Sequence, residues 1–453
     1  MKSNTYPVEK NKTYTILITG ITSEGAGIGR VQNFPVFVTD ALPGETVETL
    51  IIKISNGYAV GKLLSVADAS PDRAEPLCPQ YKRCGGCVLQ HSSYAGQLQI
   101  KQRIVQDAIE RIGGFKDREV LPVLPSSEVY RYRNKAAFPC QRTDNGVSFG
   151  FYAARSHTLI PVQDCLLESE ETIKVIHAVK EWVTEEHISA YSETKHSGLL
   201  RHVVIRESSS GEIMVTLVCT AKPQNDKALI EKLSFADSVY WNINKRNTNV
   251  IFGDSFILLH GKEQITERIL EHDFSVSPRT FLQVNHAQTE VLYRKAIELL
   301  APKINETAAD IYCGMGSITL SLAPYVKTVF GIESVPEAIE DAKHNAFANK
   351  INNAEFFCGE AEILLPELFK DRSCDIMIID PPRKGCDPRV LKAILSSSCK
   401  RLVYISCNPA TLARDLKLLC DDPGFQLKTV QPVDMFPQTG HVETVVLLIR
   451  EFC

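Results

Sequence analysis

Hydrophobic and polar positions alternate along the first part of the chain. Between Thr13 and Val66 four short runs alternate with a period of two, and turn signals at Gly25-Ala26-Gly27 and Pro43-Gly44 separate them. Alternation of this kind predicts half-buried strands. Short strands at this spacing over about 55 residues are typical of a five-stranded barrel of the OB type, and another small β module is the alternative.

A second pattern begins near Leu270 and continues to the end of the chain. Apolar runs lead into turns in Thr307–Ala323, Ile376–Gly385 and Arg401–Ile405. Runs of this length that alternate with helical patterns predict buried parallel strands in a doubly wound α/β sheet. Ligands bind at the carboxyl edge of such sheets, so we expect a Rossmann-like domain with its site at that edge.

The region between these two patterns is mixed. A linker rich in proline, aspartate and alanine covers Ala67–Pro79, and a helix that ends on Gly-Gly is predicted over Gln97–Gly113. Strands and helices then mix without a repeat from about Val120 to His260. We therefore expect three domains: a β-barrel at 5–68, an α+β domain at 74–262, and an α/β domain at 268–453, on which helix 97–113 is a candidate to pack.

Composition adds few restrictions. The 453 residues are 44% hydrophobic and 23% charged, and no apolar stretch approaches the roughly 20 residues of a membrane helix. The N-terminal sequence MKSNTYPVEKNK lacks the apolar core of a secretory signal, so we expect a cytoplasmic protein that does not bind membranes. The 14 cysteines are then better interpreted as thiols, metal ligands or catalytic groups than as disulfides. The net charge of −4 averages over the domains and decides little about nucleic-acid binding.

Three cysteines stand close together after the linker. Cys78, Cys84 and Cys87 have the spacing C-x5-C-x2-C. Gly85-Gly86 lets the backbone fold around an ion, and Cys165 is the nearest candidate for a fourth ligand. Zinc ribbons favour two C-x2-C pairs, whereas an iron–sulfur cluster tolerates one remote thiolate. We therefore expect a metal site, with an iron–sulfur cluster as the first interpretation, zinc as the second and buried structural cysteines as the third.

A glycine turn follows the first apolar run of the C-terminal region. Gly314 and Gly316 allow a ligand to approach the backbone, but the third glycine of a phosphate-binding G-x-G-x-x-G is missing. The next strand ends in Glu333, 17 residues beyond Gly316, where a carboxylate can accept hydrogen bonds from ribose hydroxyls. This combination favours S-adenosylmethionine over a dinucleotide, and a Rossmann-like sheet without a cofactor is the alternative.

Two further residues predict the chemistry. Cys407 in SCNP follows the run Arg401–Ile405, and Pro409 ends that strand, so the thiol lies at a carboxyl strand end. His441 and Glu443 in GHVE precede the terminal apolar strand. Methylation of carbon 5 of a pyrimidine needs a thiolate that adds to carbon 6 and a base that removes the carbon 5 proton. Cys407 and Glu443 would supply this pair, although a glutamate at a strand start is usually a solvated edge residue.

Together these motifs resemble a known family, the bacterial RNA uracil-5-methyltransferases, and within it the branch that modifies 23S ribosomal RNA. The resemblance covers essentially the whole chain and includes C-x5-C-x2-C…C, FLQVN (Phe281–Asn285), D-x-x-C-G-x-G (Asp310–Gly316), DPPRKG, SCNP and GHVE in the family's order. The family implies an N-terminal RNA-binding TRAM domain with an OB fold, and a [4Fe–4S] cluster on the three clustered cysteines and Cys165. Its tRNA-specific branch lacks both features, so 23S ribosomal RNA is the expected substrate.

The resemblance also implies roles for single residues. Cys407 would be the nucleophile and Glu443 the proton acceptor. Ser317 stands where relatives often carry asparagine, so we do not count it among the cofactor residues. The residues expected to bind S-adenosylmethionine are Gln283, Tyr312, Gly314, Gly316, Glu333 and Asp380.

Candidate RNA contacts come from runs of basic and aromatic residues. Alternation in Glu128–Phe138 would place Arg131, Arg133 and Lys135 on one strand face, where they would contact phosphates of an unpaired RNA loop, unless this is only an exposed edge strand. Phe281 is a candidate to stack on a target base turned out of its helix. A second run of this kind in the central region contains Tyr152, Arg155 and His157.

We therefore expect a monomeric enzyme that makes 5-methyluridine in 23S ribosomal RNA. Methylation of tRNA is one alternative, and an RNA-binding ribosome-assembly factor without turnover is another. A degenerate copy would be expected to lose Cys407 or Glu443, and this chain keeps both. Formation of 5-methylcytosine uses the same thiol addition, but enzymes that perform it carry cysteine motifs different from SCNP.

Overall fold

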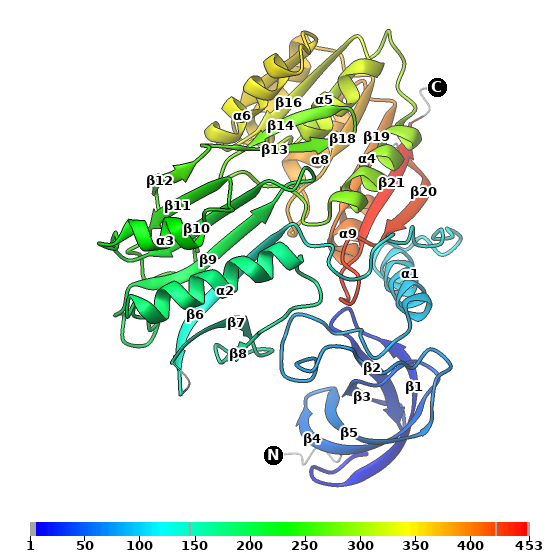
Figure 1. Cartoon of the computed structure of the whole chain (residues 1–453). Coiled ribbons are helices and arrows are strands. Elements are labelled where there is room, and N and C mark those ends of the chain that lie inside the picture. Colours follow the sequence, from blue (N-terminus) through cyan, green and yellow to red (C-terminus); the bar gives the residue numbers. More distant parts are fainter. Residues whose placement is uncertain (1–5, 145, 422–423, 451–453) are drawn as a thin grey trace.

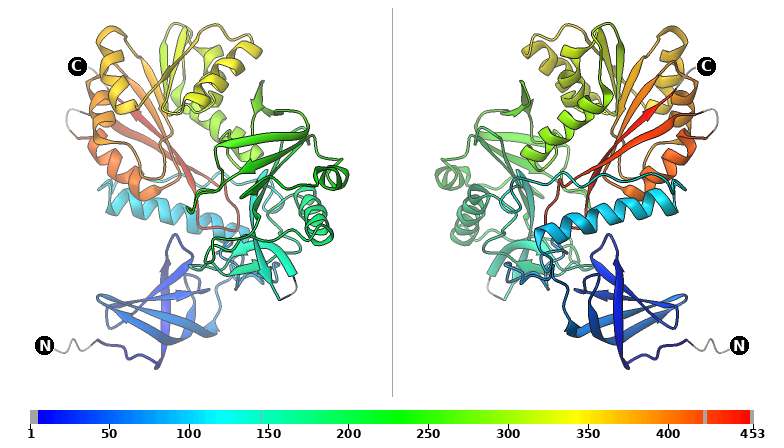
Figure 2. Two further views of the ribbon diagram at one scale, coloured as in Figure 1. Left: turned by 90° about the vertical axis from the view of Figure 1, so that its left-hand side faces the viewer. Right: turned by 90° about the vertical axis from the view of Figure 1, so that its right-hand side faces the viewer.

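The computed structural model describes residues 6–144, 146–421 and 424–450. Three parts follow one another along the chain: a closed β-barrel, a part built on a seven-stranded sheet, and a part built on a second seven-stranded sheet (Figure 1). The barrel lies at one end of the molecule, and both views in Figure 2 place the helix that follows it between the barrel and the C-terminal part. Within the described ranges, no helix has both the length and the apolar character that crossing a membrane requires.

The N-terminal barrel has the strand order β1-β2-β3-β5-β4 and is closed, which confirms the predicted five-stranded barrel. Its strands are β1 (Thr13–Ile21), β2 (Ala26–Val31), β3 (Phe34–Thr39), β4 (Thr46–Ser55) and β5 (Tyr58–Asp68). The turn predicted at Gly25-Ala26-Gly27 is partly wrong, because β2 begins within it and only Gly25 is left-handed, with a φ of 77°. In β2 a Cβ on Gly29 would lie 2.2 Å from Cγ2 of Ile16, so this glycine allows close packing of strands.

Helix α1 (Tyr94–Arg111) connects the barrel to the rest of the molecule. It begins three residues before the predicted start at Gln97, because the Ser93 side chain caps it by accepting a hydrogen bond from the N–H of Gly96 at 3.1 Å. Further along the helix, Val105 and Ile109 are fully buried in a hydrophobic cluster formed mainly by residues of the C-terminal part. Helix α1 therefore packs on the C-terminal sheet, although it precedes the central part in sequence.

The central sheet has the strand order β12-β11-β10-β9-β6-β7-β8. Its strands are β6 (Lys135–Thr143), β7 (Gly146–Tyr152), β8 (Leu159–Pro161), β9 (Leu200–Glu207), β10 (Ile213–Cys219), β11 (Ser238–Ile243) and β12 (Ser255–Gly261). The helices of this part are α2 (Glu170–Glu185) and α3 (Asp226–Lys232). Helix α2 buries Val179 and Trp182 against the sheet, and the ring of Trp182 lies 5.8 Å from that of Trp241.

The C-terminal sheet has the order β17-β16-β15-β18-β19-β21-β20. Its strands are β15 (Thr307–Ile311), β16 (Thr328–Glu333), β17 (Ala354–Cys358), β18 (Ile376–Ile379), β19 (Arg401–Ser406), β20 (Gln426–Val433) and β21 (Glu443–Ile449). Strands β15 to β19 are parallel to one another, as predicted. Strand β21 lies between β19 and β20 and is antiparallel to both.

Helices cover both faces of this sheet, so the doubly wound architecture is confirmed. The helical segments are α4 (His286–Leu300), α5 (Ser317–Leu322), η1 (Ala323–Tyr325), α6 (Pro336–Ala348), α7 (Ala361–Asp371), α8 (Pro388–Ser396) and α9 (Pro409–Leu419). One hydrophobic cluster joins α1, α7, α8 and α9 to the sheet, and the other joins α4, α5 and α6 to it. Leu270 lies in the turn of a separate hairpin, β13 (Ile265–Ile269) and β14 (His272–Val276), so the large sheet begins later than predicted, at β15.

Candidate active site

The carboxyl edge of the parallel strands collects four of the predicted site residues. Tyr312 follows β15, Glu333 ends β16, Asp380 follows β18, and Cys407 follows β19. These strands are neighbours in the order β16-β15-β18-β19, and the chain order reverses between β15 and β18. Open α/β sheets bind their ligands at such a reversal, outside the carboxyl ends of the strands.

The register of β21 brings Glu443 beside Cys407. The antiparallel ladder between β19 and β21 pairs Ser406 with Thr444, so the next position along the same register sets Cys407 opposite Glu443. On its other side Glu443 pairs with Val433 of β20 and forms the last rung of that ladder. Glu443 is only 2% exposed, whereas Cys407 is half-buried. The two residues expected to act as nucleophile and base therefore lie at one end of one strand pair.

Burial and neighbouring charges disfavour ionisation of both groups. Burial, followed by repulsion from Glu443 and Asp380, raises the pKa of the Cys407 thiol to about 11. Burial, followed by repulsion from Asp380, raises the pKa of Glu443 to about 8. The guanidinium of Arg383, in the DPPRKG loop, acts in the opposite direction on the pKa of both groups. Sequence reasoning missed Arg383, although a basic residue in a motif that also carries Asp380 was an available signal.

The predicted cofactor turn has an unusual backbone. Tyr312, Gly314 and Gly316 are all left-handed, with φ values of 72°, 55° and 85°. This conformation explains the two glycines, because other residues rarely adopt it. The Glu333 carboxylate accepts hydrogen bonds from the N–H of Gly314 at 3.2 Å and of Val335 at 2.9 Å. The end of β16 is therefore tied to the turn after β15.

Polar groups beside this turn fit a ligand with amino and hydroxyl groups. Asp310 is fully buried, and one carboxylate oxygen accepts a hydrogen bond from the Thr319 hydroxyl at 2.6 Å. Its other oxygen has no hydrogen-bond partner in the described part of the chain. A Cβ on Gly314 would meet nothing within 4 Å, so space remains beside the turn. Burial, together with the charge of Asp310, raises the pKa of Asp380 to about 7.

The segment Phe281–Asn285 lies between the central and C-terminal parts. Its backbone accepts a hydrogen bond at Gln283 from the Asn134 side chain at 3.1 Å, and Asn285 donates one to the carbonyl of Met435 at 3.2 Å. Phe281 is 75% exposed, which is unusual for a phenylalanine and leaves its ring accessible. Gln283 thus contacts the central part through its backbone, whereas Tyr312, Glu333 and Asp380 lie at the carboxyl edge of the C-terminal sheet.

The four cysteines of the predicted metal site come from two segments and lie near enough for their charges to act on Cys87. Cys78, Cys84, Cys87 and Cys165 are free, half-buried thiols. Burial, followed by the charges of the other three thiols, raises the pKa of Cys87 to about 12. The N–H of Gly86 contacts the sulfur of Cys84 at 3.4 Å, as is common around metal-bound thiolates. Among the described residues, no group of three or more His, Cys, Asp or Glu side chains has the arrangement needed to bind a metal ion.

The predicted basic strand face is wrong in its geometry. Strand β6 begins only at Lys135 and lies between β9 and β7, so it is not an edge strand and does not contain Arg131 or Arg133. Arg131 has a φ of 55°, and its guanidinium donates to both carboxylate oxygens of Asp164 at 2.7 and 2.8 Å. Arg133 forms an ion pair with the buried Glu168 at 3.2 Å. Both arginines therefore have partners within the protein.

The second basic and aromatic run lies near the barrel. Arg155 forms an ion pair with Glu24, in the turn between β1 and β2, at 2.5 Å. The rings of Tyr152 and His157 have centroids 5.5 Å apart, and both side chains contact Glu193. Arg155 and His157 are exposed and Tyr152 ends β7, so these residues belong to the central part and not to the carboxyl edge of the C-terminal sheet.

Comparison with known proteins gives consistent results. Residues 93–451 match the family described as tRNA (Uracil-5-)-methyltransferase, and residues 7–64 match the TRAM domain. The chain is 46% identical to an uncharacterized RNA methyltransferase of Bacillus cereus, with 98% of each chain covered. It is 45% identical to an uncharacterized RNA methyltransferase of Clostridium tetani, with 98% of this chain and 97% of the relative covered.

A solved structure extends the comparison to the three-dimensional fold. The crystal structure of Pyrococcus abyssi tRNA (uracil-54, C5)-methyltransferase, in complex with S-adenosyl-L-homocysteine, matches with a TM-score of 0.78 and 29% identity. The match covers 96% of this chain and all of the other. The chain belongs to the tRNA (Uracil-5-)-methyltransferase family, as an S-adenosylmethionine-dependent RNA (uracil-5-)-methyltransferase with an N-terminal TRAM domain.

Proposed function

We propose that this enzyme methylates uridine by a covalent mechanism in which Cys407 is the nucleophile and Glu443 is the base. The observation that carries the proposal is the register of β19 and β21, which sets the two residues side by side at the carboxyl edge of the sheet. S-adenosylmethionine supplies the methyl group when it is bound. Addition of the Cys407 thiolate to carbon 6 of uracil makes carbon 5 nucleophilic, and carbon 5 then takes the methyl group.

Glu443 completes the reaction. Its carboxylate removes the proton from carbon 5, the electron pair of that bond restores the double bond between carbons 5 and 6, and the bond from carbon 6 to the Cys407 sulfur breaks. The pKa of Glu443 at about 8 suits this step, because a base works best when its pKa lies near the operating pH. Arg383 favours the ionised forms of both Cys407 and Glu443.

We infer that the cofactor lies over the reversal between β15 and β18. Its proposed contacts are the turn residues Tyr312, Gly314 and Gly316, the carboxylates of Glu333 and Asp380, and Gln283. The left-handed turn, the open space beside Gly314 and the half-buried carboxylates of Glu333 and Asp380 support this assignment. Phe281 is the candidate to stack on the uracil once it has left the RNA helix, and its exposed ring supports that role.

The proposed substrate is 23S ribosomal RNA, and tRNA is the second candidate. Resemblance to the ribosomal branch supports the first, as do Cys78, Cys84 and Cys165, whose charges act on the pKa of Cys87. The TRAM domain does not distinguish between the two candidate substrates. The match to the Pyrococcus abyssi tRNA enzyme covers 96% of this chain and therefore includes most of the barrel. We propose that Cys78, Cys84, Cys87 and Cys165 hold a [4Fe–4S] cluster, with zinc as the alternative, in a monomeric cytoplasmic enzyme.

Methyl transfer to defined RNAs tests the function. The purified enzyme and methyl-labelled S-adenosylmethionine are incubated with unmodified 23S RNA or with unmodified tRNA, and the products are mapped. We expect 5-methyluridine in 23S RNA. Label in tRNA alone would favour the second substrate, and label in neither would contradict the function.

A variant tests the covalent mechanism. Glu443→Gln should still add Cys407 and transfer the methyl group, but the methylated RNA should stay attached to the protein in denaturant. Normal turnover without an adduct would reassign the base.

A further inference from the structure

The segment that leads into Glu443 is held mainly by contacts from outside its own hairpin. We call residues Asp434–Val442 the β20–β21 connection, because it joins the two strands directly before Glu443. Glu443 pairs with Val433 as the last rung of this hairpin, and terminal rungs open most readily. Within the connection, the backbone N–H and the hydroxyl of Thr439 donate hydrogen bonds to the carbonyl of Phe436. The position of Glu443 therefore depends on what holds the connection.

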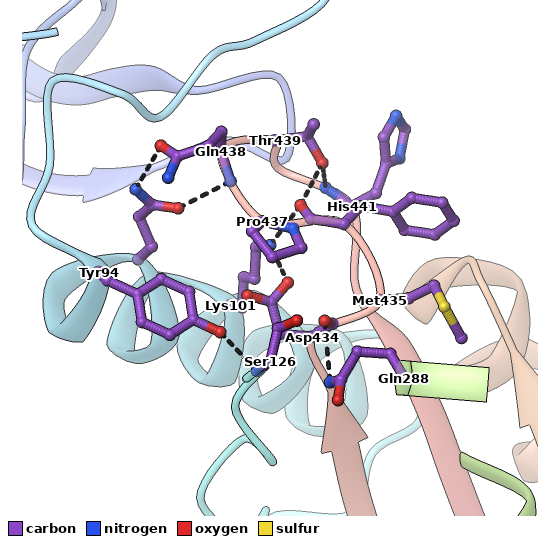
Figure 3. A network of polar contacts seen from close by, with 12 residues as sticks. Tyr94, Lys101, Ser126, Gln288, Asp434, Met435, Pro437, Gln438, Thr439 and His441 are labelled. Atoms are coloured by element: carbon purple, nitrogen blue, oxygen red, sulfur yellow. Dashed lines mark hydrogen bonds and ion pairs between the residues drawn. The ribbon is translucent and has the colours of Figure 1, made fainter. Parts of the chain in front are cut away.

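Helix α1 provides one clamp. Lys101 is fully buried, and its Nζ donates to Asp434 at 2.5 Å and to the carbonyl of Phe436 at 2.9 Å (Figure 3). Asp434 is fully buried as well. Gln288 of α4 donates to the carbonyl of Asp434 at 3.0 Å from the other side. A buried ion pair often adds little stability compared with apolar packing, but it fixes one geometry.

A second clamp lies one helical turn earlier on α1. The amide of Gln97 donates to the side chain of Gln438 and accepts a hydrogen bond from its backbone N–H, both at 2.9 Å (Figure 3). Gln438 has a left-handed backbone with a φ of 70°. Its carbonyl accepts hydrogen bonds from the N–H groups of Val88 and Leu89 at 3.0 Å, directly after Cys87. Gln438 thus joins the helix, the cysteine segment and the connection.

The barrel closes the remaining side. A Cβ on Gly440 would lie 2.0 Å from the carbonyl oxygen of Ser23, in the turn between β1 and β2. The Tyr132 hydroxyl of the central part donates to the carbonyl of Pro437 at 3.0 Å. All three parts of the chain and helix α1 therefore meet on nine residues that end next to Glu443. A surface hairpin would need none of these contacts to stay paired.

We propose that Gln97 and Lys101 are positioning residues for proton removal by Glu443. They hold the β20–β21 connection so that the Glu443 carboxylate faces carbon 5 of the uracil attached to Cys407. The inference rests on the proposed function, and it concerns only the last step. In that step the carbon 5 proton passes to Glu443, the double bond between carbons 5 and 6 re-forms, and the bond from carbon 6 to sulfur breaks. Methyl transfer precedes this step and uses Cys407 and the cofactor site, which neither clamp touches.

The test separates the two steps in a single turnover. Gln97→Leu and Lys101→Met each remove one clamp. Gln106→Leu is the matched control, because Gln106 lies on the same helix and makes equivalent backbone hydrogen bonds, at 3.0 and 2.9 Å, to Arg118 and Val120 instead of the connection. The enzyme, RNA and methyl-labelled S-adenosylmethionine are mixed and quenched in denaturant over time. Labelled RNA is counted separately as free product and as protein adduct, and binding of S-adenosylhomocysteine checks that each variant is folded.

We expect Gln97→Leu and Lys101→Met to release product about tenfold to a hundredfold more slowly, since a displacement of about 1 Å has effects of that size. Methyl transfer should stay within about twofold, so labelled adduct should accumulate, while Gln106→Leu behaves like the unchanged enzyme. If Lys101→Met fails to fold, Gln97→Leu decides alone. Equal loss of both steps, or release at the normal rate, would overturn the inference. Adduct in Glu443→Gln but not in Gln97→Leu would remove the inference and leave the proposed function standing, whereas normal turnover of Glu443→Gln would remove both.

Discussion

Replacing Glu443 by glutamine should stabilise the protein at alkaline pH while it removes the proposed base. Burial and the nearby Asp380 raise the pKa of Glu443 from 4.5 to about 8, so the folded protein binds this proton more tightly than the unfolded chain does. The stability that the protonated group contributes is complete below about pH 4.5 and is lost as the pH rises through about 8. Glutamine cannot ionise, so Glu443→Gln escapes this loss.

The size of the effect follows from the pKa. A tenfold change in proton affinity corresponds to about 1.4 kcal/mol, so a rise from 4.5 to about 8 is worth up to about 5 kcal/mol once Glu443 is ionised. Glu443 is 2% exposed, so solvent screening reduces this value little. We expect Glu443→Gln to exceed the unchanged protein by about 3 to 5 kcal/mol at about pH 9 and to match it at about pH 4.5.

Urea unfolding at these two pH values measures the difference in the free energy of unfolding. Glu340→Gln is the matched control, because it makes the same chemical change on a side chain that is 73% exposed. Two results would refute the reasoning: a variant no more stable than the unchanged protein at the higher pH, or a gain of equal size at both. The first would mean that Glu443 does not resist ionisation in the folded protein.

Three further predictions concern activity and metal content. Cys407→Ala should lose methyl transfer completely, because carbon 5 is not activated without the thiol. Calorimetry should show that this variant still binds S-adenosylhomocysteine. Appreciable turnover on unmodified RNA would contradict the prediction. Product release by the unchanged enzyme should rise about tenfold between about pH 7 and pH 9, as Glu443 with its pKa of about 8 ionises, and quenched single-turnover assays would show whether it does. Protein purified without oxygen should be brown with about four irons per chain. Cys84→Ser should lose the colour and bind RNA more weakly with unchanged cofactor affinity, and one zinc without sulfide would show the cluster assignment to be wrong.

Much of the fold could be predicted because its strands carry their own signals. Period-two alternation marks the barrel, and continuous apolar runs ending in turns mark β15, β18 and β19. Strand β2 was not predicted from the sequence, because its glycines are also typical of turns. Gly27 and Gly29 lie in this strand because a Cβ there would collide with β1 or with the chain at Ala41, and such a contact leaves no trace in periodicity.

The site could be predicted only as far as each residue depends on its own strand. The positions of Tyr312, Asp380 and Cys407 at strand ends follow from local sequence. Contacts between distant segments do not. The conformation of Arg131 depends on Asp164, and the clamp at Lys101 depends on Asp434, 333 residues away in sequence. No local pattern contains either partner.

The antiparallel insertion of β21 between β19 and β20 makes the distance between the two proposed catalytic groups a property of the backbone. Cys407 and Glu443 are 36 residues apart in sequence, yet one hydrogen-bonded register sets them side by side. Side-chain changes along these strands that keep the ladder leave this spacing intact. Deleting a single residue within β21, with the rest of the strand kept in register, would move Glu443 one step away from Cys407 and turn its side chain to the opposite face of the sheet. Evolution can therefore vary the side chains along this strand pair widely, but insertions or deletions within it would separate the nucleophile from its base.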